Sequence, residues 1–270
     1  MNPSMPALES ISQFLNELVR TCGDFILSHR NKVNAQDIEI KALNSLVSFV
    51  DQETERRLVE GLKKIFPEAG FITEEETVAQ EAKEWNWIVD PLDGTTNFLF
   101  DLPVFAISVA LYHRDEPQVA VVYELGQKEL FSAVKGQGAF LNQRPLKVRH
   151  EKSLDKALIA TGFPYYDFDR LAEFNVLLGH LYTHTRGVRR LGSAATDLAY
   201  VAAGRFNAFF EYGLHAWDVA AGILLVQEAG GKLCDYRLGN DYLFGKEIIA
   251  SSEAIHSEFS QLISEYMLKR

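Results

Sequence analysis

Two aspartates three residues apart, Asp90 and Asp93, directly follow an apolar, β-prone run of the chain. Carboxylates that point at one spot repel each other unless a divalent cation lies between them, and Mg²⁺ prefers oxygen ligands. Gly94 permits a tight turn and a close approach of the backbone to a ligand. The amides of Gly94, Thr95 and Thr96 would then be free donors at a helix N-terminus, which favours an anion. This spacing predicts a site for a metal ion beside a phosphate group.

A simpler interpretation of the same turn is a helix that follows a buried strand, with Asp93 or Thr95 as its N-cap. That interpretation accounts for one aspartate and one threonine. It does not account for two carboxylates, a glycine and two threonines around one turn. We therefore favour the ligand site.

Two motifs of the chain resemble the signatures of one protein family. The run Asp-Pro-Leu-Asp-Gly-Thr-Thr-Asn-Phe at residues 90–98 is similar to the first signature of the inositol monophosphatase family, whose members are Mg²⁺-dependent, lithium-sensitive phosphatases. The run Trp-Asp-Val-Ala-Ala-Gly at residues 217–222 is similar to the C-terminal signature of that family. Two separated motifs in the right order are more specific than one, and the resemblance covers almost the whole chain.

Both helices and strands are needed to position these residues. Apolar residues at helical spacing predict a helix at residues 8–29 and a second one from Ser48 to the stop at Pro67. A short strand, residues 71–73, runs into Glu74, as the central strand runs into Asp90. The two strands could therefore bring both carboxylates to one edge of a sheet.

The second half of the chain shows a different pattern from the first. Apolar runs at residues 104–112, 118–124 and 129–134 predict an antiparallel meander. Strands and helices then alternate, with strands expected at 157–161, 187–191, 208–212, 232–235 and 247–250. Helices are expected at 169–183, from the turn at 192–195 through 203, at 219–229 and at 253–269. We expect one unit over residues 1–270, with a metal- and phosphate-binding half at 1–150 and a half that completes the pocket at 151–270. The resemblance implies an α/β fold, a layered αβαβα sandwich with the site between layers.

The acidic residues at predicted element ends are hard oxygen ligands, and neither of the two motifs contains a histidine or a cysteine, so they suit Mg²⁺ or Mn²⁺ rather than Zn²⁺. The resemblance implies two or three ions. It places Glu74, Asp90 and the carbonyl of Leu92 at one ion, and Asp90, Asp93 and Asp218 at the second. From the residues alone, Asp218 is equally well explained as a capping residue of the helix that follows it.

Asp51 lies near the start of the second predicted helix, where the helix dipole favours a solvated aspartate. The resemblance implies another role, in which Asp51 holds Thr95 and the two orient the attacking water beside Glu74. The family usually has glycine where this chain has Thr73, so the backbone before Glu74 departs from the family pattern.

The substrate pocket is expected on the second half of the chain as well as at the central turn. By resemblance its contacts are Asp93, Gly94, Thr95, Gly192, Ser193, Ala194, Glu211 and Asp218. From its strand alone, Glu211 is more typical of a surface residue on an edge strand. This pocket wall offers acceptors for hydroxyl groups and no obvious basic clamp for a second phosphate, which favours a monophosphate ester of a polyol or sugar.

These observations predict Mg²⁺-dependent hydrolysis of such an ester, inositol monophosphate foremost, by direct in-line attack of a metal-activated water. Three related activities stay open: fructose-1,6-bisphosphatase, histidinol-phosphate phosphatase and 3′-phosphoadenosine 5′-phosphate phosphatase. A protein of a different class, a non-catalytic regulatory or binding protein on the same fold, is the remaining alternative.

Composition excludes several other classes. The net charge of -10 argues against non-specific binding to nucleic acid or to a membrane surface. No apolar run approaches membrane-spanning length, no signal segment precedes the first helix, and Cys22 and Cys234 are typical of reduced core cysteines, so we expect a cytoplasmic protein. A homodimer is expected by analogy with the family. His180 and His184 are four apart, a spacing that suits a metal, but surface histidines explain them better.

Overall fold

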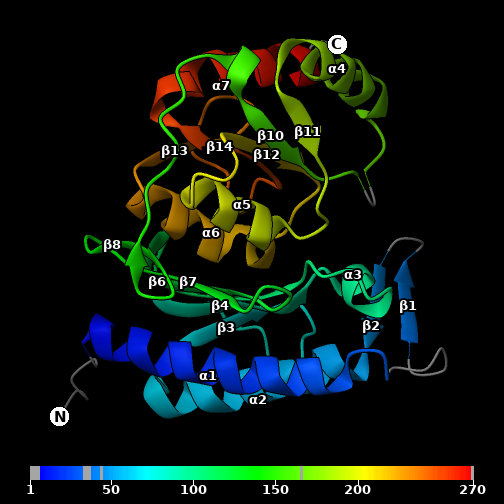
Figure 1. Ribbon diagram of the computed structural model, residues 1–270. Helices are drawn as coiled ribbons and strands as arrows, with labels where there is room; N and C mark the ends of the chain where they lie inside the picture. Colours follow the sequence, from blue (N-terminus) through cyan, green and yellow to red (C-terminus); the bar gives the residue numbers. More distant parts are fainter. Residues whose placement is uncertain (1–6, 33–37, 43–44, 165–166, 269–270) are drawn as a thin grey trace.

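Helices and sheets alternate in five layers in the computed structural model, which describes residues 7–32, 38–42, 45–164 and 167–268 (Figure 1). From one outer layer to the other, the helices are α1 (Leu8–His29) and α2 (Phe49–Ile65), then α5 (Ala194–Ala202) and α6 (Ala216–Glu228), then α4 (Leu171–His184) and α7 (Glu253–Leu268). A seven-stranded sheet separates the first two pairs, and a five-stranded sheet separates the last two. The predicted αβαβα sandwich is confirmed.

The larger sheet has the strand order β3-β4-β5-β6-β7-β8-β9. Its strands are β3 (Gly70–Thr73), β4 (Trp85–Asp93), β5 (Ala106–His113), β6 (Glu116–Glu124), β7 (Glu129–Val134), β8 (Gly138–Leu141) and β9 (Arg144–Pro145). All pairs are antiparallel except β3 and β4, which run parallel with Thr73 opposite Val89. The carboxyl ends of β3 and β4 therefore meet at one edge, as the sequence predicts.

The smaller sheet has the strand order β11-β10-β12-β14-β13. Its strands are β10 (Leu158–Thr161), β11 (Gly187–Arg189), β12 (Ala208–Tyr212), β13 (Gly231–Cys234) and β14 (Glu247–Ser252). A separate pair, β1 (Ile38–Ala42) and β2 (Ser45–Ser48), precedes α2. The extended pieces expected between residues 31 and 48 correspond to this pair, although residues 33–37 and 43–44 lie outside the described residues.

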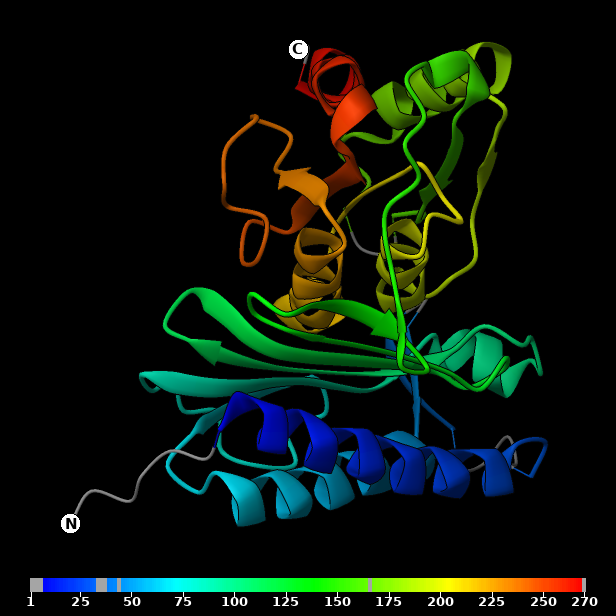
Figure 2. The same cartoon turned by 60° about the vertical axis from the view of Figure 1, so that its left-hand side comes forward.

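The two inner helices illustrate how burial follows from the sequence. Figure 2 shows α5 and α6 between the two sheets, and every residue of α6 from Val219 to Val226 is buried. A helix covered on both faces needs apolar or small residues all round, which this run supplies. By contrast α1 buries one stripe, including Ile11, Leu15 and Val19, against the larger sheet. Within the described residues, no helix is long and apolar enough to cross a membrane.

Candidate metal and phosphate site

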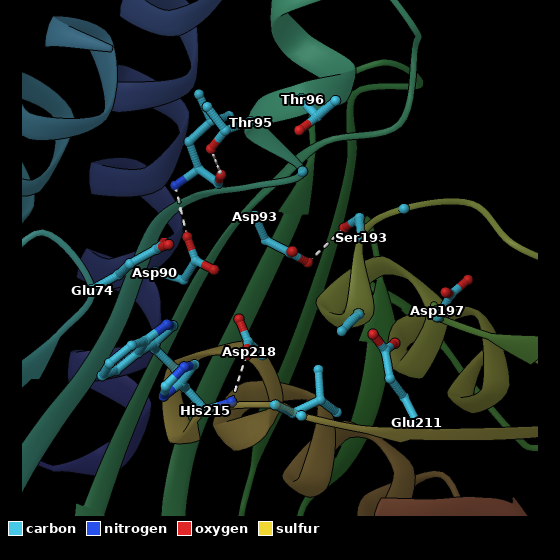
Figure 3. Close-up of a pocket in the computed structure, with 18 of the residues that line it drawn as sticks. Glu74, Asp90, Asp93, Thr95, Thr96, Ser193, Asp197, Glu211, His215 and Asp218 are labelled. Carbon is cyan, nitrogen blue, oxygen red and sulfur yellow. Dashed lines mark hydrogen bonds between the residues drawn. The ribbon is translucent and has the colours of Figure 1, made fainter. Parts of the chain in front are cut away.

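Three aspartates from distant parts of the chain meet between the layers. Asp90 and Asp93 lie at the end of β4 and Asp218 lies in the first turn of α6. Each offers one carboxylate oxygen, and these three atoms lie within 4.8 Å of one another (Figure 3). The His215 amide donates to Asp218 Oδ2 at 2.6 Å, so the start of the helix also orients that carboxylate. Glu74 reaches the same place from β3, beside Asp90.

The grouping is electrostatically unfavourable without a cation. Burial raises the pKa of Asp90 well above its usual range, and the negative charges of Glu74, Asp93 and Asp218 raise it further. Burial, and then the charge of Asp93, likewise raise the pKa of Asp218. Converging oxygen donors of this kind match the ligand preference of Mg²⁺ and Mn²⁺. The residues therefore fit a divalent cation, and the three aspartates are the one such group among the described residues.

Asp93 also connects the end of β4 with the start of α5. Its Oδ2 atom accepts hydrogen bonds from Ser193 Oγ at 2.6 Å and from the Ala195 amide at 2.7 Å, at the start of α5. Burial raises the pKa of Asp93 to about 6, and these two bonds act against that rise. Both hydrogen bonds are accepted by Oδ2, so neither of them occupies the other carboxylate oxygen, Oδ1.

The turn after β4 has the sharp geometry that the glycine predicts. Gly94 has φ +90° and precedes the five-residue helix α3 (Thr95–Leu99). A Cβ at this position would lie 3.0 Å from the Val104 carbonyl oxygen and 3.1 Å from that of Gly192, so glycine is needed for both the angle and the space. Among the described residues, no side chain caps the helix. The interpretation that Asp93 or Thr95 is the N-cap is therefore wrong.

Asp51 is buried rather than solvated, with 1% of its surface exposed. Its Oδ2 atom accepts from the Ser48 amide at 2.9 Å and from Ser48 Oγ at 2.6 Å, which closes the first turn of α2. Its Oδ1 atom accepts from Thr95 Oγ1 at 2.8 Å. The expectation from the residues alone, a solvated aspartate, is wrong because this helix end packs against the turn at Thr95. The Asp51–Thr95 contact implied by the resemblance is present.

Glu211 lies across the pocket from the aspartates. Its strand, β12, lies in the middle of the smaller sheet, and 7% of the residue is exposed, so the expectation of an edge-strand surface residue is wrong. Gly162 makes room for it, because a Cβ there would lie 1.8 Å from Glu211 Oε1. Burial and the charge of Asp93 raise the pKa of Glu211 to about 8, against the effect of Arg190.

Two further residues of the pocket were not predicted. Arg190 lines it and lowers the pKa values of Asp93, Asp197 and Glu211, so the pocket wall contains a basic group, although no basic clamp is obvious in the sequence. Asp197, on α5, is 1% exposed, and its Oδ1 atom has no hydrogen-bond partner within the described part of the chain. In the sequence, the only sign that these two residues belong to the site is their closeness to predicted pocket residues. Arg190 comes two residues before Gly192, and Asp197 comes four residues after Ser193.

Comparison with known proteins decides the family. The sequence profile of the Inositol monophosphatase family matches residues 7–268. The chain belongs to the inositol monophosphatase family. Members of this family are phosphatases that use divalent metal ions, which agrees with the acidic group at Asp90.

Individual proteins are also similar to this chain over most of its length. The Nus factor SuhB of Escherichia coli (strain K12) is 40% identical over 237 residues, which are 87% of this chain and 89% of the relative. The extragenic suppressor protein suhB of Bartonella henselae has a similar structure, with a TM-score of 0.89, 36% identity and coverage of 95% of this chain and 99% of the other. The IMPase of Thermotoga maritima has a TM-score of 0.86 and 33% identity, with 94% and 96% covered.

Most of the site residues predicted from the family resemblance come together in one pocket of about 130 Å³. Those lining it are Glu74, Asp90, Leu92, Asp93, Gly94, Thr95, Gly192, Ser193, Ala194, Glu211 and Asp218. Asp51 lies behind Thr95 and does not line the pocket. His180 and His184 stack on each other on α4, outside this pocket, with ring centroids 4.1 Å apart.

Proposed function

We propose that this protein hydrolyses a phosphate monoester of a polyol or sugar, inositol monophosphate foremost, in the presence of Mg²⁺. The observation that carries the proposal is the convergence of Asp90, Asp93 and Asp218 within 4.8 Å beside the turn at Gly94. Membership of the inositol monophosphatase family supports the same reaction.

We assign Glu74, Asp90 and the carbonyl of Leu92 to one cation, and Asp90, Asp93 and Asp218 to a second, with Mn²⁺ as a possible substitute for Mg²⁺. When bound, such cations lower the pKa of water and stabilise a leaving alkoxide. The side chains hold these positions in advance, because Leu92 donates its amide to Asp90 Oδ1 at 2.9 Å.

Thr95, held by Asp51, would position the water that attacks phosphorus in line, and Glu74 would lie beside that water. Thr95 Oγ1 lies 2.8 Å from Asp51 Oδ1 and 2.9 Å from the Leu92 carbonyl oxygen. When the hydroxyl hydrogen points to Asp51, the oxygen of Thr95 is left as an acceptor for a proton of the water. The amides of Gly94 and Thr95 then hold phosphate oxygens as charge redistributes in the transition state.

The rest of the substrate faces the second half of the chain. Glu211 and the turn Gly192–Ala194 supply hydrogen-bond acceptors and donors for hydroxyl groups. Arg190 is the one cation that lines the described pocket, and it acts on Asp93, Asp197 and Glu211 at once. Its charge is thus largely offset, which supports a polyol monophosphate over a substrate with a second phosphate.

The test is a measurement of phosphate release from four compounds: inositol 1-phosphate, fructose 1,6-bisphosphate, histidinol phosphate and 3′-phosphoadenosine 5′-phosphate. We expect inositol 1-phosphate to give the highest kcat/KM with Mg²⁺, no activity after EDTA, and recovery when Mg²⁺ is restored. Lithium should inhibit, by analogy with the family. Activity that persists in EDTA would rule out the assignment of Asp90, Asp93 and Asp218, and a preference for another compound would replace the substrate.

A role as a Nus factor is the second candidate, because several relatives at about 40% identity carry the name Nus factor SuhB. This candidate corresponds to the alternative of a non-catalytic regulatory or binding protein on the same fold. The Asp93→Asn variant separates the two roles in a bacterium whose own SuhB has been removed. Rescue of that strain by the variant would support the Nus-factor role independently of hydrolysis.

We also propose a cytoplasmic homodimer that binds a small phosphate ester rather than nucleic acid. The net charge of -10 supports the absence of nucleic-acid binding. Phe100 and Leu102, which follow α3, are 71% and 52% exposed and are suitable for a contact with a second copy. Light scattering after gel filtration tests the dimer, and a monomer at micromolar concentration would contradict it.

A further inference from the structure

Glu55, on α2, is fully buried and is surrounded by donors from the loop that follows β3. Its Oε1 atom accepts from Thr77 Oγ1 at 2.6 Å, from the Thr77 amide at 2.7 Å and from Thr73 Oγ1 at 3.0 Å. Its Oε2 atom accepts from the Glu75 amide at 2.8 Å. Four donors on one buried carboxylate satisfy a group that would otherwise be costly to bury.

These four hydrogen bonds hold the chain on both sides of Glu74. Thr73 and Glu75, the residues on either side of it, are both bound to Glu55, and the Glu74 amide itself donates to the Val89 carbonyl oxygen at 3.3 Å. The backbone of Glu74 is thus held by the neighbouring strand β4 and, through its neighbours, by α2. The direction of its side chain toward Asp90 follows from this backbone.

Thr73 is part of the same network. Its amide donates to Gln80 Oε1 at 2.8 Å, and its hydroxyl accepts from Gln80 Nε2 at 2.9 Å while it donates to Glu55. A glycine, which the family usually has at this position, would keep the amide bond and lose both hydroxyl bonds. The departure from the family pattern at Thr73 therefore adds contacts that fix the loop.

Asp51 and Glu55 are four residues apart, so they lie on the same face of α2, one turn from each other. Asp51 holds Thr95, and Glu55 holds the loop of Glu74. One helix therefore helps to set the spacing between the hydroxyl of Thr95 and the carboxylate of Glu74.

We infer that Glu55 is a positioning residue, which fixes the Glu74 carboxylate at the cation site through hydrogen bonds to Thr73, Glu75 and Thr77. The inference rests on the proposed function, because it assigns Glu74 to a cation. Partners that orient a metal ligand typically contribute about 10- to 100-fold to metal affinity. Glu55 acts in this way without touching the substrate.

The experiment compares Glu55→Gln with a matched control, Glu124→Gln. Glu124 is also fully buried and accepts two loop amides, from Gly126 at 2.9 Å and Gln127 at 2.7 Å, but it does not line the pocket. Mn²⁺ and Mg²⁺ are titrated into the metal-free proteins by calorimetry, and the midpoint of thermal unfolding is measured in EDTA. Glutamine has the shape of glutamate but only one acceptor oxygen, so at least one loop amide would face its NH₂ group.

We expect Glu55→Gln to bind Mn²⁺ about 10-fold or more weakly than the wild type, whereas Glu124→Gln should lose stability without a change in Mn²⁺ affinity. Equal Mn²⁺ affinity in the wild type and in Glu55→Gln would overturn the positioning role while the proposed function stands. A wild type that binds neither cation would overturn both. If Glu55→Gln does not fold, Thr77→Val, which removes one hydroxyl donor and keeps the amide, must show a smaller loss in the same direction, and unchanged affinity there overturns the inference.

Discussion

Replacement of Thr95 by valine tests the chemistry of the site most directly, because valine keeps the shape of the side chain and removes only the hydroxyl. That hydroxyl lies 2.8 Å from Asp51 Oδ1 and 2.9 Å from the Leu92 carbonyl oxygen, and it is the group proposed to orient the attacking water. Loss of a positioned acid or base typically costs about 10²- to 10⁴-fold in rate. We therefore expect kcat to fall by about that factor, which corresponds to about 3 to 5 kcal/mol in the barrier.

For Thr95→Val we expect a smaller change in the free energy of unfolding than in the activation free energy. Asp51 is 1% exposed, and Thr95 supplies the hydrogen bond to its Oδ1 atom, whereas Ser48 continues to satisfy Oδ2. An unsatisfied buried acceptor costs about 1 to 3 kcal/mol. We expect a decrease of that size in the free energy of unfolding, measured by urea titration, with Mg²⁺ affinity nearly unchanged because Thr95 is not assigned as a ligand.

The matched control is Thr95→Ser, which keeps the hydroxyl and loses one methyl group. Phosphate release at saturating Mg²⁺ and substrate should show kcat for this variant within about tenfold of the wild type, far above that of Thr95→Val. If Thr95→Val has the kcat of the wild type, the water is oriented by another group, and the role given to Asp51 and Thr95 is wrong.

Two further predictions concern the charge at the site and the buried thiols. Asp93→Asn keeps an acceptor for Ser193 but removes a negative charge from the proposed ligands, so kcat should fall by about 10³-fold or more with an unchanged circular dichroism spectrum; normal turnover would rule out the ligand role. Cys22 is 1% exposed, and burial raises its pKa to about 12 from a usual value of 9.0. The folded state therefore binds the thiol proton more tightly than the unfolded state, so this contribution to stability is complete below pH 9 and is lost as the pH rises toward 12. Urea titrations at pH 8 and pH 10.5 should show a loss that is smaller in Cys22→Ala, and an equal loss in both proteins would contradict it.

The carboxylates at strand ends could be predicted because their signal is local. An apolar run followed at once by Asp90, and another followed by Glu74, are visible in the sequence, and parallel pairing of β3 with β4 brings both ends together. The same reasoning has the central strand end where it runs into Asp90, yet β4 continues through Pro91 to Asp93, with an irregular register against β5 between Asp90 and Asp93. A proline can lie within a strand at such an irregularity, which only the partner strand reveals.

Residues whose role depends on distant contacts could not be predicted from the residues alone. The helix dipole accounts for Asp51 near a helix start but not for the turn at Thr95 that covers it. Glu211 is wrongly predicted to lie on an edge strand. The position of its strand within the smaller sheet depends on pairing with strands far along the chain, which the local sequence does not show. Arg190 and Asp197 belong to no recognisable motif. They lie near Glu211 only because the folded chain places all three around one pocket.

The proposed cation site depends on residues from both halves of the chain. Residues 1–150 contain Asp90 and Asp93, but Asp218 comes from α6, and the orientation of Asp93 depends on the bonds it accepts from Ser193 and Ala195. The turn is joined to the second half again where Asn97 Nδ2 donates to the Leu191 carbonyl oxygen at 2.8 Å. Because the complete ligand set exists only when the layers are packed together, a bound cation favours the assembled sandwich over either half alone. The same contacts that complete the proposed site therefore couple metal binding to the folding of the whole chain.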